Sequence, residues 1–148
     1  MHRIIFTGHV LASSDAVAMR ADAELAVKQC AEHDLSGMTL YCQGSFISVL
    51  EGDVSPLQAI LAFYQVDPRM GEVEAILDIP AKHREFPDYR IGFLRESFVP
   101  DVEGAFAITG PSLKAALSSV SDGEAKTLLR TFGLVNGLVP PTALASGF

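Results

Sequence analysis

The stretch "GSFISVLEG", residues 44–52, decides the fold of this chain, because it is a short apolar strand between two glycines. Side chains alternate along a strand, so Phe46, Ser48 and Leu50 are expected on one face of a sheet. The residues between them are expected on the other face. Ser48 is therefore a single hydroxyl side chain in the middle of an apolar surface, and its role is the first question that the sequence raises.

Segments on both sides of this strand extend the pattern to a whole domain. The preceding run "SGMTLYC" is strand-like, and the Gln43-Gly44 pair between the two runs predicts a β-hairpin. Strands are predicted at 3–8, 36–42, 45–51, 72–79 and 89–94. With one helix before the hairpin and one after it, the order is β-α-β-β-α-β-β. This order predicts an α+β fold: a ferredoxin-like βαββαβ sandwich with an extra fifth strand.

Local signals set the expected ends of the helices. The first helix has an apolar stripe formed by Ala23, Ala26, Val27, Cys30 and Ala31. Serine and proline at 55–56 predict the start of the second helix, and Asp67-Pro68 predicts its end, because a residue before proline avoids the helical region.

Two further helices are predicted after residue 110. Pro111 begins the first of them, and Ser121 with Glu124 predicts a capping box for the second. We therefore expect one domain over 1–97 and a helical extension over 98–148. The extension is expected to cover the bare face of the sheet or to pair with a second subunit.

Composition excludes several classes of function. Hydrophobic residues make up 49% of the chain, and the formal net charge of −7 disfavours binding to nucleic acid. No apolar run approaches the roughly 20 residues that span a bilayer. The two cysteines, Cys30 and Cys42, match neither a disulfide framework nor a metal-ligand spacing. We expect a cytoplasmic protein with reduced thiols and no metal, membrane or nucleic-acid partner.

Four stretches taken together resemble the BLUF family of flavin-binding blue-light sensors. They are "DLSG", "LYCQGSFISVLEG", "VDPRM" and "REFPDYRIGF", and the resemblance covers about residues 1–95. It implies the same ferredoxin-like fold, with a flavin ring, from FAD or FMN, between the two helices of that fold. It also implies a photochemical trio of tyrosine, glutamine and asparagine around the ring.

All three members of that trio are replaced in this chain. By position, the tyrosine of the family falls on Phe6, the glutamine on Ser48 and the asparagine on Cys30. Phe6 has no hydroxyl proton to couple to electron transfer, and Ser48 has no amide that could exchange hydrogen-bond partners. Cys30 is a small, soft hydrophobe and a weak donor. The resemblance therefore predicts a BLUF-like domain without the usual photochemistry.

The resemblance places four more residues at flavin-pocket positions. They are Gln29, Thr39, Asp67 and Arg69. Arg69 is expected either to bind an anion or to form a surface ion pair with Asp67 or Glu72. Three peripheral positions also depart from the family, where Met70, Tyr89 and Ile91 replace histidine, tryptophan and methionine.

The sequence favours a regulatory domain that acts through protein–protein contacts, as a homodimer, rather than an enzyme. Ser48 lacks the base and the orienting group of a nucleophile, and the four histidines are scattered along the chain. Two alternatives stay open. In the first, the protein still binds flavin and has an altered or silent photocycle. In the second, it is a small-molecule-binding or hydrolytic protein that uses the vacated cavity between the helices.

Overall fold

A computed structural model of the protein describes residues 1–11, 16–42, 44–94 and 101–137. Gln43 of the predicted hairpin turn lies outside these residues, as do 98–100 and 138–148 of the predicted extension. The strands are β1 (His2–Val10), β2 (Ser36–Cys42), β3 (Ser45–Gly52), β4 (Met70–Pro80), β5 (Tyr89–Leu94) and β6 (Ala105–Ile108). The helices are α1 (Ala16–Glu32), α2 (Val54–Val66), α3 (Gly110–Ser118) and α4 (Glu124–Val135).

The strands form one sheet in the order β4-β1-β3-β2-β5-β6. The pairs within β4-β1-β3-β2 are antiparallel, whereas β5 and β6 continue the sheet in parallel. The predicted ferredoxin-like α+β fold is confirmed. β6 was missed, because a strand of four residues is too short to show a clear alternation.

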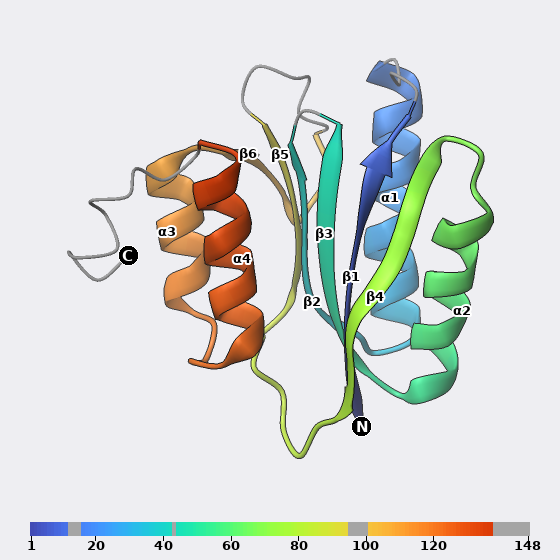
Figure 1. Ribbon diagram of the computed structural model, residues 1–148, viewed down its shortest axis with the longest axis vertical. Helices are drawn as coiled ribbons and strands as arrows, with labels where there is room; N and C mark the ends of the chain where they lie inside the picture. Colours follow the sequence, from blue (N-terminus) through green and yellow to red (C-terminus); the bar gives the residue numbers. More distant parts are fainter. Residues whose placement is uncertain (12–15, 43, 95–100, 138–148) are drawn as a thin grey trace.

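Helices cover both faces of the sheet, so the molecule has three layers (Figure 1). α1 and α2 lie on one face, and α3 and α4 lie on the other. On the second face, Leu113, Leu117 and Leu129 are at most 2% exposed and pack on Ile5, Leu40 and other apolar side chains of the sheet. The two C-terminal helices thus cover the sheet face opposite to α1 and α2, which is one of the two predicted arrangements. The domain boundary at residue 97 stays a prediction.

Two predicted helix starts are wrong. α2 begins one residue before Ser55, with Asp53 as its N-cap. α4 has Gly123 as its N-cap, without a side-chain cap, so the capping box of Ser121 and Glu124 does not form. The Ser121 amide instead donates to the Glu85 carbonyl at 3.0 Å, a contact from a distant loop that local sequence does not reveal. The predicted end of α2 before Asp67 is confirmed.

Gly37 explains how β2 and β3 approach each other so closely. Its φ is +149°, and a Cβ at this position would overlap the carbonyl oxygen of Val49 in β3. Any other residue would therefore push the two central strands apart. Within the described part of the chain, none of the helices has the length and apolar character needed to cross a membrane.

Candidate functional site

The alternation predicted for β3 places Ser48 on the face that α1 and α2 cover. Phe46 and Leu50 belong to the core between the sheet and these helices, whereas Ile47 and Val49 belong to the opposite core. Ser48 is 1% exposed and lies opposite Phe6 of β1. The same register brings Thr39 of β2 to its other side.

Three hydroxyl groups form a chain across β3, β2 and β5. The Oγ of Ser48 lies 2.8 Å from Oγ1 of Thr39, and the Tyr89 hydroxyl donates to the same Thr39 oxygen at 2.8 Å. Thr39 is 1% exposed, so these hydrogen bonds between hydroxyls satisfy polar groups that would otherwise be unpaired in the core. Burial raises the pKa of the Tyr89 phenol well above its usual value.

Next to Ser48, four rings form what we name the aromatic cluster: Phe6, Tyr41, Phe46 and Tyr64. The Tyr64 ring, from α2, has its centroid 5.2 Å from that of Phe6 and 5.4 Å from that of Phe46. The hydroxyls of Tyr41 and Tyr64 are 3.1 Å apart. Burial is the main cause that raises the pKa of both phenols, so both stay protonated near neutral pH. The cluster fills the sheet face beneath α2 with tightly packed rings.

Cys30 and Gln29 lie next to each other on α1 but in different surroundings. Cys30 is 4% exposed and packs in the same core as Phe6 and Phe46, whereas Gln29 is half-buried. Burial raises the pKa of the Cys30 thiol to about 12, so the thiol is neutral at physiological pH. A neutral, buried thiol is a packing group with little capacity to donate a hydrogen bond.

Arg69 is held by two carboxylates. Its Nη1 donates to Asp22 of α1 at 2.8 Å, and its Nη2 donates to Asp67 at 2.9 Å. The Arg69 guanidinium keeps the pKa of Asp67 below its ordinary value. The predicted pair with Asp67 is present, but the predicted alternative, Glu72, lies 3.1 Å from His9 instead. Arg69 thus links α1 to the turn between α2 and β4.

Asp22 is a member of this site that sequence reasoning missed. It lies 47 residues before Arg69, and only the packing of α1 beside α2 brings the two side chains together. Tyr41 and Tyr64 were missed for a similar reason, since apolar periodicity assigns both to the core without indicating that their hydroxyls meet. No local pattern in the sequence identifies either of these two contacts.

Glu51, at the end of β3, is a fully buried carboxylate with a complete set of donors. Its Oε2 accepts from Nε and Nη2 of Arg3 at 2.9 and 2.8 Å and from the Glu85 amide at 2.8 Å. Its Oε1 accepts from the Ser36 hydroxyl and the Phe86 amide. One side chain therefore ties β1, β2 and the loop before β5 together, which is a structural task.

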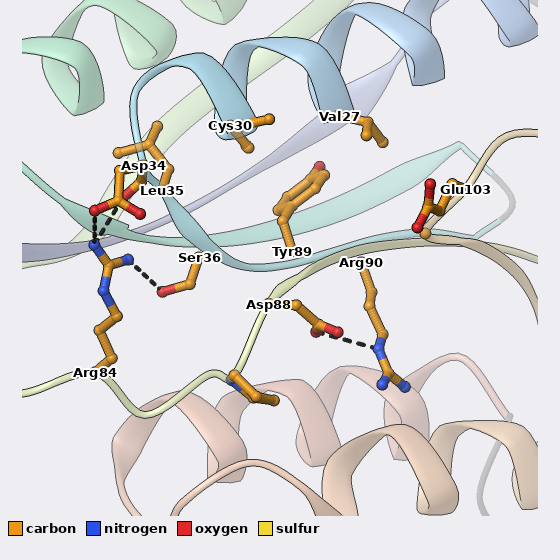
Figure 2. A pocket seen from close by; sticks show the side chains of 13 residues that line it. Val27, Cys30, Asp34, Leu35, Ser36, Arg84, Asp88, Tyr89, Arg90 and Glu103 are labelled. Carbon is orange, nitrogen blue, oxygen red and sulfur yellow. Dashed lines mark hydrogen bonds and ion pairs between the residues drawn. The ribbon is translucent and has the colours of Figure 1, made fainter.

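A cavity of about 610 Å³ lies between α1, the loop before β5 and the Glu103-Gly104 turn (Figure 2). In Figure 2 the Tyr89 side chain points toward α1, between Cys30 and Val27. Arg84 at one end donates to Ser36 at 2.8 Å and to the Asp34 carboxylate at 3.2 Å. Phe6, Thr39 and Ser48 do not line this cavity.

The seven predicted site residues thus fall into three groups. Phe6, Thr39, Ser48 and Cys30 meet on the buried sheet face beneath α1 and α2. Asp67 and Arg69 meet each other at the end of α2, and Gln29 lies half-buried at the margin of α1. Which of them contact a flavin stays a prediction.

Comparisons with known proteins agree with the fold described above. BlrP1 from Klebsiella pneumoniae, as a calcium and cyclic-di-GMP complex, matches with a TM-score of 0.68 and 20% identity. That match covers 92% of this chain and 34% of BlrP1. BlrB, described as a BLUF protein in its dark state, matches with a TM-score of 0.55 and 26% identity, over 64% of this chain and 73% of BlrB.

A bacterial light-regulated adenylyl cyclase matches over 65% of this chain and 29% of the cyclase, with a TM-score of 0.59 and 19% identity. The chain thus spans about a third or less of the cyclase and of BlrP1. A comparison with curated proteins gave no match. The sequence model of the family "sensors of blue-light using FAD" matches residues 1–92. The chain belongs to the BLUF family of flavin-binding blue-light sensor domains.

Proposed function

We propose that this chain is a regulatory BLUF domain that has lost blue-light photochemistry and acts through protein–protein contacts. One observation carries the proposal: the positions of the photochemical trio are packed parts of the core. Phe6 is 0% exposed with the Tyr64 ring against it, and Ser48 is 1% exposed with its hydroxyl bonded to Thr39. Photochemistry in the family needs a phenol and an amide at these two places, and neither is present.

The arrangement of the residues fits an isoalloxazine ring poorly. A planar ring above Phe6 and Ser48 would have to displace Tyr64 and break its 3.1 Å contact with Tyr41. Ring carbonyls and the ring N–H would then face Cys30 and Phe6, which offer weak or no partners. Each buried polar atom left unpaired costs about 1–3 kcal/mol, so two or three such atoms would weaken flavin affinity by several powers of ten.

Arg69 and Asp67, at the other end of the flavin pocket that the family implies, also bind groups of this protein. Arg69 forms ion pairs with Asp22 and Asp67, so two carboxylates already neutralise its positive charge. A phosphate would have to compete with both of them. This arrangement supports the same proposal independently of the trio.

A protein partner is proposed by analogy with two larger proteins, of which the chain matches about a third or less. One of those is a bacterial light-regulated adenylyl cyclase, and the structure of BlrP1 contains FMN and cyclic di-GMP. We infer that this chain, like a sensor module, transmits its state by contact, in the cytoplasm and as a homodimer. Light scattering coupled to size-exclusion chromatography tests the last point, and a mass equal to one chain of 15.8 kDa would contradict it.

The decisive experiment is a visible absorption spectrum of the purified protein after incubation with excess FAD or FMN and removal of the free flavin. We expect a colourless protein. Flavin bands that remain with the wild-type chain would overturn the flavin-free proposal and favour a flavin-binding domain. A long-lived red shift on illumination would then separate an active photoreceptor from a silent one.

Restoring the pocket provides the matched comparison. A triple variant, Phe6→Tyr with Cys30→Asn and Ser48→Gln, returns the family groups, and Tyr64→Ala added to it removes the ring that fills the space. We expect the fourfold variant to retain more flavin than the triple variant, and the wild-type chain to retain none. Equal retention by wild type and fourfold variant would mean that these four side chains do not control flavin binding.

A further inference from the structure

The cavity beside α1 offers a binding site that lies apart from the aromatic cluster. Its volume of about 610 Å³ lies within the 300–1,000 Å³ typical of small-ligand sites. It opens between α1 and β5 (Figure 2), whereas the family resemblance implies a flavin ring between α1 and α2. Of the seven residues at flavin-pocket positions, Cys30 alone also lines this cavity.

One part of the cavity wall is apolar and includes an aromatic ring. Val27, Cys30 and Leu35 line it from the side of α1, and Tyr89 and Pro87 line it from the side of the sheet. The Tyr89 hydroxyl donates a hydrogen bond to Thr39, and this bond holds the ring in place. A fixed aromatic ring stabilises a second planar ring by offset or edge-to-face contact, in addition to the gain from burial.

The charges at the rim determine the sign of the ligand. Both arginines there are paired, Arg84 with Asp34 at 3.2 Å and Arg90 with Asp88 at 3.2 Å. Among the residues that the structure describes, Glu103 has no such partner, and it lies at the end of the cavity opposite to Arg84 (Figure 2). The Glu103 carboxylate is thus the unpaired charge among the described residues of the rim, and the whole protein has a net charge of −7. Both facts favour a cationic ligand over an anionic one.

We propose that the cavity between α1 and β5 binds a small planar heteroaromatic cation, with its ring against Tyr89 and its positive group toward Glu103. This inference goes beyond the proposed function and does not require it. The ligand would touch Cys30 and Tyr89, two positions at which the chain departs from its family. Tyr89 is also joined through Thr39 to Ser48, so an occupied cavity contacts the hydroxyl chain in the centre of the sheet.

A pair of fluorescent probes of equal shape and opposite charge tests the proposal. 9-Aminoacridine is a planar cation at neutral pH, and acridine-9-carboxylate is a planar anion. We expect saturable binding of the cation and at least about tenfold weaker binding of the anion, since the carboxylate that attracts the cation repels the anion. Equal affinity for both probes, or no saturable binding of the cation, would overturn the proposal.

Two pairs of variants locate the site. Ala31 lines the cavity and is exposed, so Ala31→Leu fills the space without disturbing the core, whereas Ala21→Leu is the control on the same helix outside the cavity. Glu103→Gln removes the rim charge, and Glu74→Gln removes the same charge from β4, at the far edge of the sheet.

We expect Ala31→Leu to abolish cation binding and Glu103→Gln to weaken it about threefold, as suits an exposed ion pair. Both controls should bind as wild type does. If Glu74→Gln lowers affinity as much as Glu103→Gln, or Ala21→Leu as much as Ala31→Leu, the probe is attracted by the acidic surface in general and the site is refuted. Unchanged far-UV circular dichroism verifies that all four variants are folded.

Discussion

Ser48 and Glu51 show how two polar residues of one strand are accommodated in a buried environment by different means. Ser48 shares its hydroxyl with Thr39 and needs one partner, whereas Glu51 needs five donors around its two oxygens. The difference follows from charge, because an ionised group inside a protein is costly unless it is fully paired. At the scale of single residues, the site is therefore governed by satisfied polar groups in a dry core.

Glu51→Gln should lower the free energy of unfolding by about 3 kcal/mol, because the guanidinium of Arg3, 6% exposed, loses its two short bonds to a carboxylate and retains only Glu85 at 3.4 Å. Urea denaturation measures the loss. The control, Glu32→Gln, breaks an exposed pair with Lys28 and should change stability by less than about 0.5 kcal/mol. Similar losses of stability for both variants would show that the buried pair of Arg3 and Glu51 stabilises the protein no more than an exposed pair.

The two thiols should be unreactive in the folded protein. Burial raises the pKa of Cys30 to about 12 and that of Cys42 to about 11, so hardly any thiolate exists at about pH 8. Ellman's reagent should modify neither thiol rapidly in native protein and both of them after unfolding in urea. Rapid release of one equivalent from native protein would contradict the burial of these side chains.

At the scale of elements, side-chain alternation and helix stops are local, but helix starts in this chain depend on contacts. β3 follows the predicted alternation and ends one residue later than predicted, β5 has the predicted bounds, and α2 ends where proline requires. α3 instead begins with a capping box of Thr109 and Ser112 that the sequence analysis did not single out. Both side chains accept from the backbone amide of the other residue, at 3.0 and 2.7 Å.

Thr109→Ala should destabilise the protein by about 1 kcal/mol, because the Ser112 amide loses its acceptor at the start of α3. Thermal or urea unfolding provides the measurement. Thr131→Ala, at an exposed position within α4, is the matched control and should not lower stability, since alanine favours helix interiors. A neutral Thr109→Ala would mean that packing alone fixes the start of α3.

At the scale of the whole molecule, one sheet separates two apolar cores, and each core needs its own pair of helices. The core beneath α1 and α2 contains the aromatic cluster, and the core beneath α3 and α4 contains mostly aliphatic side chains. Because both cores share the strands, we expect them to unfold together as one cooperative unit.

Leu129→Ala tests this coupling from α4. Leu129 is 0% exposed, and its truncation should cost about 3 kcal/mol. Far-UV circular dichroism and the near-UV signal of Tyr41, Tyr64 and Tyr89 should shift to the same lower midpoint, although the tyrosines lie in the other core. Leu25→Ala, at a position that is 43% exposed, should change little. Separate transitions would indicate that residues after 97 form an independent unit.

The family, the ferredoxin-like order of the elements and the replaced trio can all be obtained from the sequence, because periodicity and short motifs are properties of neighbouring residues. The face on which Ser48 lies follows from the same alternation. These features needed no tertiary information, since a strand of eight residues already fixes the direction of each of its side chains.

Only the tertiary structure decided what surrounds those positions. Arg69 meets Asp22 across 47 residues, Tyr64 reaches Phe6 from another element, and a cavity opens beside α1. Each of these contacts is set by how helices pack on a finished sheet, and that packing joins residues whose separation in the chain carries no periodic signal. The sequence therefore determined which groups the family site lacks, and the fold determined what occupies the space.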